Sequence, residues 1–354
     1  MKKKKQQPVI RSTAGLAAHL GLSRWTVSRA LNGHAGIRRE TRERVEQAMT
    51  HFQFAPSPLA RALRGGRTGT VGICLQELEN FNLASKISTL HGKLRQAGFR
   101  ALLEFSDGQP EVEAEILHHF ISMQVEEIVI FSGMLSPQSA SFRALREAKI
   151  PVVLIDPRES SLPGAVWVDR AAAIRQVTRH LLGLGHRRFA SLGINPTYYY
   201  GTVRSRALQE CLTPPHAPRG TRLLSLFEPE AEMMDFDYGR RLAELLLAEP
   251  EPPTALVALN DRIAFGAMEL LKQRAFRIPK DFSVVGYDNS DLSAFAVPAL
   301  TTIDPQVDLL IDNALQLLLG NIGKTSIGKN VNRRIEPRLI LRASTAAPSQ
   351  RPRI

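Results

Sequence analysis

The 354-residue chain is predicted to form an all-α helix-turn-helix headpiece followed by an α/β body of two doubly wound parallel-sheet lobes. Two short amphipathic helical patterns flank a glycine near the N-terminus. After residue 70, strand patterns alternate with helical patterns, which is typical of parallel sheets covered by helices. The charge is also divided unevenly, because residues 1–67 hold 14 of the 46 Lys and Arg residues but 3 of the 34 acidic residues. This asymmetry indicates a polyanion-binding module attached to an electrostatically ordinary body.

The helix-turn-helix is predicted at residues 14–32, with a turn at Gly21-Leu22 and with Ser12 and Ser23 as helix caps. Apolar residues recur at helical spacing on one face of each helix: Leu16, Ala17 and Leu20, then Val27, Ala30 and Leu31. The other faces of the second helix carry polar, basic and aromatic residues: Arg24, Trp25, Thr26, Ser28, Arg29 and Asn32. Such a helix can enter the DNA major groove with its N-terminus first. A plain helical hairpin is the alternative, and the charge asymmetry argues against it.

A third helix is predicted at Thr41–Phe52, and a two-turn helix at Ser57–Arg64. The second of these is too short to persist alone in water, so we interpret it as a hinge that orders only with a partner. A plain linker is the alternative, but it would contain more Gly and Ser and no apolar Leu59 and Leu63. The predicted divisions are a headpiece at 1–55, a hinge at 56–68, a body at 69–346 and a flexible tail at 347–354.

The body is predicted to contain nine strands and eight helices. The strands are Thr70–Gln76, Ala101–Phe105, Glu127–Ser132, Val152–Asp156, Ala165–Val168, Phe189–Gly193, Leu223–Leu226, Ala255–Leu259 and Phe282–Tyr287. The helices are Asn82–Ala97, Glu111–Met123, Gln138–Ala148, Ala171–Leu184, Thr202–Cys211, Gly239–Ala248, Asp261–Arg274 and Gln306–Asn321. This number of strand and helix units is large for a single sheet, so we expect two lobes. Ligands of such sheets bind beyond the carboxyl ends of the strands.

Composition predicts a cytoplasmic protein with no membrane partner. The two cysteines, Cys74 and Cys211, cannot form a disulfide framework, which favours a reducing compartment. The basic start Lys2–Lys5 continues into Gln-Gln-Pro and not into an apolar segment, so it is not a signal peptide. No run approaches the roughly 20 apolar residues of a transmembrane helix.

The motifs do not indicate an enzyme. The sequence contains no HExxH, GxSxG or Walker-type loop and no Cys/His set with metal-ligand spacing. His186, in the segment LGHRR, is interpreted as part of a helix-to-strand connection and not as a general base. We therefore expect no catalytic residue, no metal site and no cofactor.

Motifs along the whole chain resemble the LacI/GalR family of bacterial transcriptional repressors. They occur in the expected order and spacing at Thr26–Asn32, Thr41–Val45, Pro58–Arg64, Arg67–Gly72, His180–Arg188, Ala258–Asp261, Ile278–Asp288, Pro298–Ile303 and Pro337–Thr345. The resemblance covers about residues 12–345. It implies a body like the periplasmic sugar-binding proteins. A transport solute-binding protein shares that body, but the basic headpiece and the absence of a signal peptide disfavour it. A non-specific architectural DNA binder is a further alternative, disfavoured by Arg24, Trp25 and the ligand-binding body.

For DNA, the resemblance implies a homodimer on a double-stranded, pseudo-palindromic operator. Arg24, Trp25 and Arg29 take the base-reading positions of the second helix. Arg can pair bidentately with guanine, while Trp25 either contacts a thymine methyl or packs on the DNA backbone. Short polar groups suit phosphate contacts: Ser12, Ser23, Thr26, Ser28 and Asn32. By analogy, paired hinge helices enter the minor groove at Ala60 and Leu63, with Leu63 as a wedge. A glycine at position 15, where an Asp is usual, suggests that the first helix starts late.

For the ligand, the resemblance implies a small effector, a sugar or sugar derivative, in the cleft between the lobes. The matching positions are Gln76, Glu77, Phe81, Asp156, Tyr198, Tyr200, Arg204, Asn260 and Asp288. An Arg and an Asp across a cleft can bracket vicinal hydroxyls. The alternatives are an interlobe salt bridge between Arg204 and Asp288, and a surface turn at the tyrosines. Of the adjacent Asn260 and Asp261, we expect Asp261 to cap the following helix and Asn260 to bind the ligand.

Overall fold

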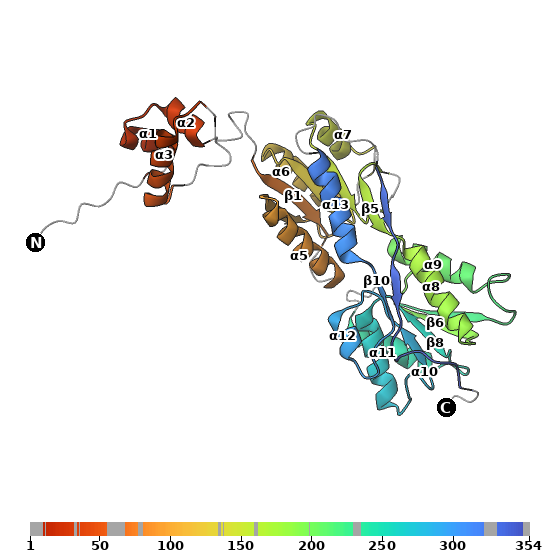
Figure 1. Ribbon diagram of the computed structural model, residues 1–354. Helices are drawn as coiled ribbons and strands as arrows, with labels where there is room; N and C mark the ends of the chain where they lie inside the picture. Colours follow the sequence, from red (N-terminus) through yellow and green to blue (C-terminus); the bar gives the residue numbers. More distant parts are fainter. Residues whose placement is uncertain are drawn as a thin grey trace, which may run out of the picture. The chain divides into compact units, whose positions relative to one another are not determined.

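The structure is a computed structural model that describes residues 10, 12–31, 34, 36–54, 68–76, 81–133, 136, 138–158, 162–197, 199–228, 235–321 and 331–349. The chain separates into two compact units, Met1–Gly69 and Thr70–Ile354 (Figure 1). The predicted hinge helix Ser57–Arg64, with Ala60 and Leu63, lies outside the described residues, as do residues 350–354 of the predicted tail.

The first unit contains three helices, α1 (Thr13–Leu20), α2 (Arg24–Leu31) and α3 (Arg39–His51). The expectation that α1 starts late is wrong, because the Ser12 hydroxyl oxygen accepts a hydrogen bond from the Gly15 amide at 3.1 Å and caps the helix directly. Gly21 ends α1 in the left-handed region with φ of 62°, a conformation that glycine adopts without steric cost. The three helices enclose one small core, to which they and the segment after α3 contribute Leu16, Ala17, Val27, Ala30, Val45, Ala48 and Phe54.

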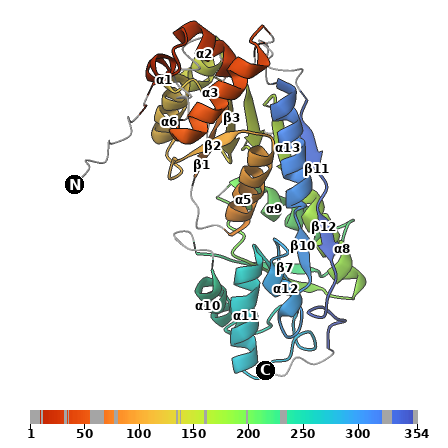
Figure 2. The same ribbon diagram turned by 60° about the vertical axis from the view of Figure 1, so that its left-hand side comes forward.

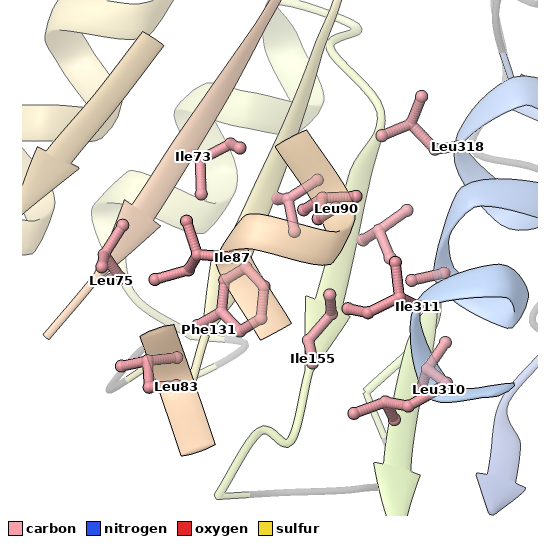
Figure 3. Close-up of a cluster of buried hydrophobic side chains, with 14 of the residues drawn as sticks. Ile73, Leu75, Leu83, Ile87, Leu90, Phe131, Ile155, Leu310, Ile311 and Leu318 are labelled. Carbon is pink, nitrogen blue, oxygen red and sulfur yellow. The ribbon is translucent and has the colours of Figure 1, made fainter. Parts of the chain in front are cut away.

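The first lobe of the body contains a six-stranded parallel sheet. Its strands, in spatial order, are β11 (Arg333–Ile335), β5 (Ala165–Val168), β4 (Val152–Ile155), β3 (Glu127–Phe131), β1 (Thr70–Leu75) and β2 (Arg100–Phe105). Apolar side chains of α5 (Phe81–Gln96) and α13 (Val307–Asn321) cover one face (Figure 3). Those of α6 (Pro110–Ser122) and α7 (Ala140–Glu147) cover the other. Ile73 of β1, Leu90 of α5 and Ile311 of α13 are fully buried in the first of these cores.

The second lobe repeats this three-layer arrangement with four parallel strands. They are β7 (Arg222–Leu226), β6 (Arg188–Leu192), β8 (Ala255–Ala258) and β9 (Ser283–Val285), in that spatial order. One face packs against α10 (Phe236–Leu247) and α11 (Asp261–Gln273). The other packs against α8 (Arg170–Gly183) and α9 (Tyr199–Cys211), and the short helix α12 (Asp291–Phe295) follows β9. The prediction of two doubly wound lobes is confirmed.

Two short antiparallel strands, β10 (Thr302–Asp304) and β12 (Arg338–Ile340), lie between the lobes (Figure 2). After β10 the chain returns to the first lobe as α13 and β11, and it then re-enters the second lobe through β12. The sequence reading missed β10, β11, β12 and α12. Each has three to five residues, and the strands are defined by partners far away in the chain, which no local pattern reveals.

His186 joins the C-terminal segment to the second lobe. Its Nδ1 lies 2.8 Å from the Thr254 hydroxyl, and its Nε2 lies 3.0 Å from the Ser283 hydroxyl and 2.9 Å from the Ala346 carbonyl oxygen. Burial lowers the pKa of His186 to about 4, so the imidazole is neutral near pH 7. His186 lies between α8 and β6, as the sequence predicted, and these contacts give it a structural role. The neighbouring residues 347–349 of the predicted tail are among the described residues.

No helix of the described residues is both long and apolar enough to cross a membrane. Within the same part of the chain, no group of three or more His, Cys, Asp or Glu side chains is placed to hold a metal ion.

Candidate DNA-reading helix and ligand site

The start of α2 is held by its cap and by the headpiece core. The Ser23 hydroxyl oxygen accepts a hydrogen bond from the Thr26 amide at 3.0 Å, as the sequence predicted. Val27 and Ala30 are buried against the other helices, and this fixes which face of α2 is turned outward. Arg24 and Trp25 lie on that outward face, and the Trp25 side chain is 64% exposed. A large indole left in water at a helix N-terminus is typical of a contact surface and not of a core.

Arg29 stacks on Trp25, with the centre of its guanidinium 4.5 Å from the indole centroid. Its Nε atom is buried and has no hydrogen-bond partner in the described part of the chain. The cation–π contact attracts the two side chains to each other and restrains their relative position. Arg29 therefore orients Trp25, in addition to the base-reading position that the resemblance implied for it.

The predicted phosphate contacts are placed as follows. Ser12 and Ser23 are exposed at the starts of α1 and α2, where the helix dipoles favour an anion. Both serine oxygens already accept an amide hydrogen bond, and the Ser23 hydroxyl also shares a 2.8 Å hydrogen bond with the Thr26 hydroxyl. Thr26 and Ser28 are half-buried on α2, and Asn32 lies outside the described residues.

In the body, the predicted ligand residues are divided between the lobes. Gln76 and Asp156 follow β1 and β4 of the first lobe, whereas Arg204, Asn260 and Asp288 belong to the second. The alternative of an interlobe salt bridge between Arg204 and Asp288 is therefore wrong, because both belong to the lobe built on β6, β8 and β9. Glu77 and Tyr198 lie outside the described residues, and the side chains of Phe81 and Tyr200 are not described.

Asp156 is the centre of a buried ion cluster in the first lobe. Its Oδ2 lies 2.6 Å from Lys86 Nζ on α5, and its Oδ1 lies 3.1 Å from Arg170 Nη1 at the start of α8. The Val168 amide also donates to Oδ1 at 3.0 Å. Burial alone would raise the pKa of Asp156, but Arg170 and Lys86 together hold it well below its usual range. Asp156 is thus ionised and bound by two cations.

Arg204, on α9, belongs to the second lobe. Its guanidinium lies 4.1 Å from the ring centroid of Tyr287, and its Nη1 donates to the Leu259 carbonyl oxygen at 3.3 Å. Its Nε is buried without a hydrogen-bond partner among the described residues. Burial raises the pKa of Tyr287, while the charges of Arg204 and Arg170 act to lower it.

Asn260, and not Asp261, caps α11, which corrects the expectation for this pair. The Asn260 Oδ1 accepts from the Ile263 amide at 2.8 Å. Asp261 is instead buried and accepts hydrogen bonds from the Thr302 hydroxyl at 2.5 Å and from the Ser290 amide at 2.8 Å. Burial raises the pKa of Asp261 to about 6. The Asn260 oxygen, predicted to contact the ligand, is thus engaged at the start of α11.

Sequence reading missed four residues of this region: Lys86, Arg170, Asn195 and Tyr287. Asn195 follows β6, and its Nδ2 is buried without a hydrogen-bond partner among the described residues. Arg170 and Tyr287 come two residues after the ends of β5 and β9, so a search for polar groups beyond strand carboxyl ends would have found three of the four. Lys86 gave no signal, because it lies within a helix and its role depends on Asp156, 70 residues away.

Comparisons with known proteins agree with both parts of this description. A sequence profile described as "Bacterial regulatory proteins, lacI family" matches residues 15–57, and one described as "Periplasmic binding protein-like domain" matches residues 178–345. The HTH-type transcriptional regulator reg1 of Streptomyces lividans is 30% identical over 353 residues, covering 96% of this chain and 98% of that protein. The chain belongs to the lacI family of transcriptional regulators.

Two further relatives are similar over nearly the whole length of this lacI-family regulator. The repressor CytR of Escherichia coli K12 is 27% identical, covering 98% of this chain and 99% of its own. The crystal structure of the Lac repressor dimer bound to operator and the anti-inducer ONPF superimposes with a TM-score of 0.81 at 25% identity, over 96% of this chain and 100% of that one. The lacI-family protein is thus a DNA-binding transcriptional regulator, and not an enzyme.

Proposed function

We propose that this lacI-family regulator binds a pseudo-palindromic operator as a homodimer and represses transcription. Its operator affinity would be set by a small ligand, a sugar or sugar derivative, held between the two lobes of the body. The observation that carries the proposal is the start of α2, where Arg24 and Trp25 are exposed in a headpiece that, together with the hinge, holds nearly all the excess positive charge. Because the proposed partner is operator DNA, we propose that the protein acts in the cytoplasm.

The polar groups beyond the strand ends support a ligand in the body. Buried polar atoms are almost always paired in folded proteins, because an unpaired one loses its bonds to water without replacement. Arg204 Nε and Asn195 Nδ2 are both buried and both lack a partner among the described residues. A polar ligand would satisfy them. The Lac repressor in the related structure binds the anti-inducer ONPF as well as operator, and we extend this pairing of DNA and ligand to the present chain.

An exposed apolar surface on the second lobe supports the homodimer. Leu292, Phe295 and Val297, in and directly after α12, are 58%, 82% and 79% exposed. Soluble proteins rarely leave adjacent large apolar side chains in water unless a partner covers them. We propose a second copy of the chain as that partner, since the related Lac repressor is a dimer.

Phe295→Asp is expected to shift the protein from dimer to monomer in sedimentation velocity, because it would bury a charge in the proposed interface. Leu319→Asp, at an exposed apolar position of α13 in the other lobe, is the matched control and should remain dimeric. A Phe295→Asp variant that still sediments as a dimer would contradict the assignment of this surface.

The experiment that tests the proposed function is a selection from random duplex DNA with the full-length protein. We expect enrichment of a near-palindrome, because two copies of α2 would read two half-sites. Binding that weakens steeply with salt and enriches no sequence would contradict specific recognition.

With the selected duplex, Arg24→Ala should lose discrimination at one base position of each half-site, by about 1–3 kcal/mol. Arg24→Lys is the matched control, because it keeps the charge but loses the planar fork that pairs with guanine. If Arg24→Ala weakens binding equally on all sequences and Arg24→Lys binds like the wild type, Arg24 contacts only phosphate.

A further inference from the structure

Three buried polar atoms beyond the strand ends of the second lobe have no hydrogen-bond partner within the described part of the chain. They are Asn195 Nδ2, Arg204 Nε and the Tyr287 hydroxyl oxygen. Asn195 follows β6, Tyr287 follows β9, and Arg204 contacts the chain after β8 through the Leu259 carbonyl oxygen. Because β6, β8 and β9 are adjacent parallel strands, the three groups lie at one edge of the sheet.

Helix α9 brings these groups together. Its Gly201 packs so closely against Asn195 that a side chain at this position would collide with the Asn195 carbonyl oxygen. Arg204 comes three residues later, on the same side of the helix, and its guanidinium lies 4.1 Å from the centroid of the Tyr287 ring. Arg204 therefore covers the face of this ring, and it makes no hydrogen bond to the phenol oxygen.

The Tyr287 side chain is held in place from two sides. Its ring belongs to the apolar core between the sheet and helices α8 and α9, and the residue is 5% exposed. The neighbouring backbone is bonded to the β10 segment, because the Gly286 amide donates to the Thr301 carbonyl oxygen and the Asp288 amide to the Ile303 carbonyl oxygen, both at 2.9 Å. Burial raises the pKa of Tyr287, so its hydroxyl keeps its proton at neutral pH and can donate a hydrogen bond.

Asn195 presents a donor in a fixed direction. Its Oδ1 accepts hydrogen bonds from the Thr197 amide at 2.9 Å and from the Thr197 hydroxyl at 2.8 Å. A backbone N–H can only donate, so the Asn195 oxygen faces Thr197 and the Nδ2 group points away from it. Asn195 is 1% exposed, which shields this donor from bulk water.

We infer that the Tyr287 hydroxyl bonds directly to a hydroxyl group of the ligand and makes the protein discriminate a sugar from the analogue that lacks this group. Asn195 supplies a second bond, to another oxygen of the same ligand. A buried polar group without a hydrogen bond is unfavourable, so a ligand that completes the bond is selected over one that cannot. This inference rests on the proposed function, in which the ligand is a sugar or sugar derivative, and it assigns residues that select that ligand.

The first test is urea unfolding of the ligand-free, full-length protein. Tyr287→Phe should unfold at the same urea concentration as the wild type or at a higher one, because the substitution removes a hydroxyl that has no partner. Tyr238→Phe is the matched control in the same lobe and should unfold at a lower concentration, since the Tyr238 oxygen accepts a hydrogen bond from the Glu228 amide at 2.7 Å. A lower midpoint for Tyr287→Phe would show that the protein itself bonds this hydroxyl and would overturn the inference.

The second test is isothermal titration with glucose, galactose and ribose, each accompanied by its monodeoxy analogues. The parent sugar that binds best should lose about tenfold in affinity in Tyr287→Phe, a difference of about 1.4 kcal/mol. One of its deoxy analogues should bind Tyr287→Phe at least as tightly as the wild type, because the bond is already absent. Tyr238→Phe should bind every probe like the wild type. Asn195→Asp keeps an oxygen facing Thr197 and removes the donor, so it should lose affinity for the same parent sugar.

The outcomes separate this inference from the proposed function. Tyr287→Phe binding the parent sugar with wild-type affinity, or losing equal affinity for the parent and for every deoxy analogue, would overturn the inference and leave the proposed function intact. Wild-type affinity in Asn195→Asp would overturn the second bond. If no probe binds the wild type, the proposed sugar ligand fails and the inference fails with it, whereas binding to the selected duplex shows whether DNA recognition persists.

Discussion

Leu16→Ala is expected to unfold the headpiece and to abolish specific DNA binding while the body remains folded. Leu16 is fully buried in a core that the three helices and the segment after α3 share. Truncation of a buried leucine costs about 2–5 kcal/mol of unfolding free energy. A unit of this size has little stability in reserve, so a loss of this magnitude approaches its whole folding free energy. The body has four other cores, none of which includes Leu16.

Scanning calorimetry of the full chain measures this effect, with DNA binding assayed on the same sample. The headpiece transition should disappear, and the transition of the body should keep its midpoint. Gln47→Ala is the control, because Gln47 is exposed on α3 of the same unit and should change the free energy of unfolding little. Specific DNA binding at wild-type affinity by Leu16→Ala would show that the folded headpiece is not the DNA-reading unit.

Asp156→Ala is expected to have the second large effect, a loss of about 3–5 kcal/mol in the free energy of unfolding of the body. The substitution leaves Lys86 and Arg170 buried beside each other without the carboxylate that both now contact. Because breaking a buried pair is far costlier than replacing both partners, Lys86→Met in the same chain should recover part of the loss.

Urea unfolding of the two single variants and the double variant measures this coupling. Glu147→Ala, which removes an exposed carboxylate of α7, is the control and should change the free energy of unfolding by less than about 0.5 kcal/mol. Additive losses in the double variant would mean that Lys86 and Asp156 do not depend on each other, contrary to their 2.6 Å separation.

The helix-turn-helix could be predicted from sequence because its determinants are local. The Ser12 and Ser23 caps act on amides three residues away, and Gly21 meets a requirement of its own backbone. Repeated apolar spacing likewise located the long strands and helices of the body. The strands β10 and β12 could not be found in this way, because each pairs with a segment more than 30 residues away.

The ligand site was harder to predict for the same reason. Asn260 and Asp261 are both residues that commonly cap helices, so the sequence does not show which of them caps α11. The structure assigns the cap to Asn260, because Asp261 is buried and bonded to Thr302 and Ser290, which are distant in sequence. Lys86 and Arg170 are unremarkable charges in two helices until the fold brings them to Asp156. Family resemblance indicated Asp156 and Arg204, but the cations around Asp156 follow only from the tertiary structure.

The most direct test of a ligand-controlled DNA-binding regulator is the affinity of the full-length protein for its selected duplex. This affinity is measured with and without a saturating concentration of a sugar or sugar-derivative probe that binds the protein. The account predicts a change of about 5–150-fold in operator affinity. It also predicts the same factor, by linkage, when ligand affinity is measured with and without DNA. A probe that binds the free protein and the protein–DNA complex with equal affinity would contradict the account.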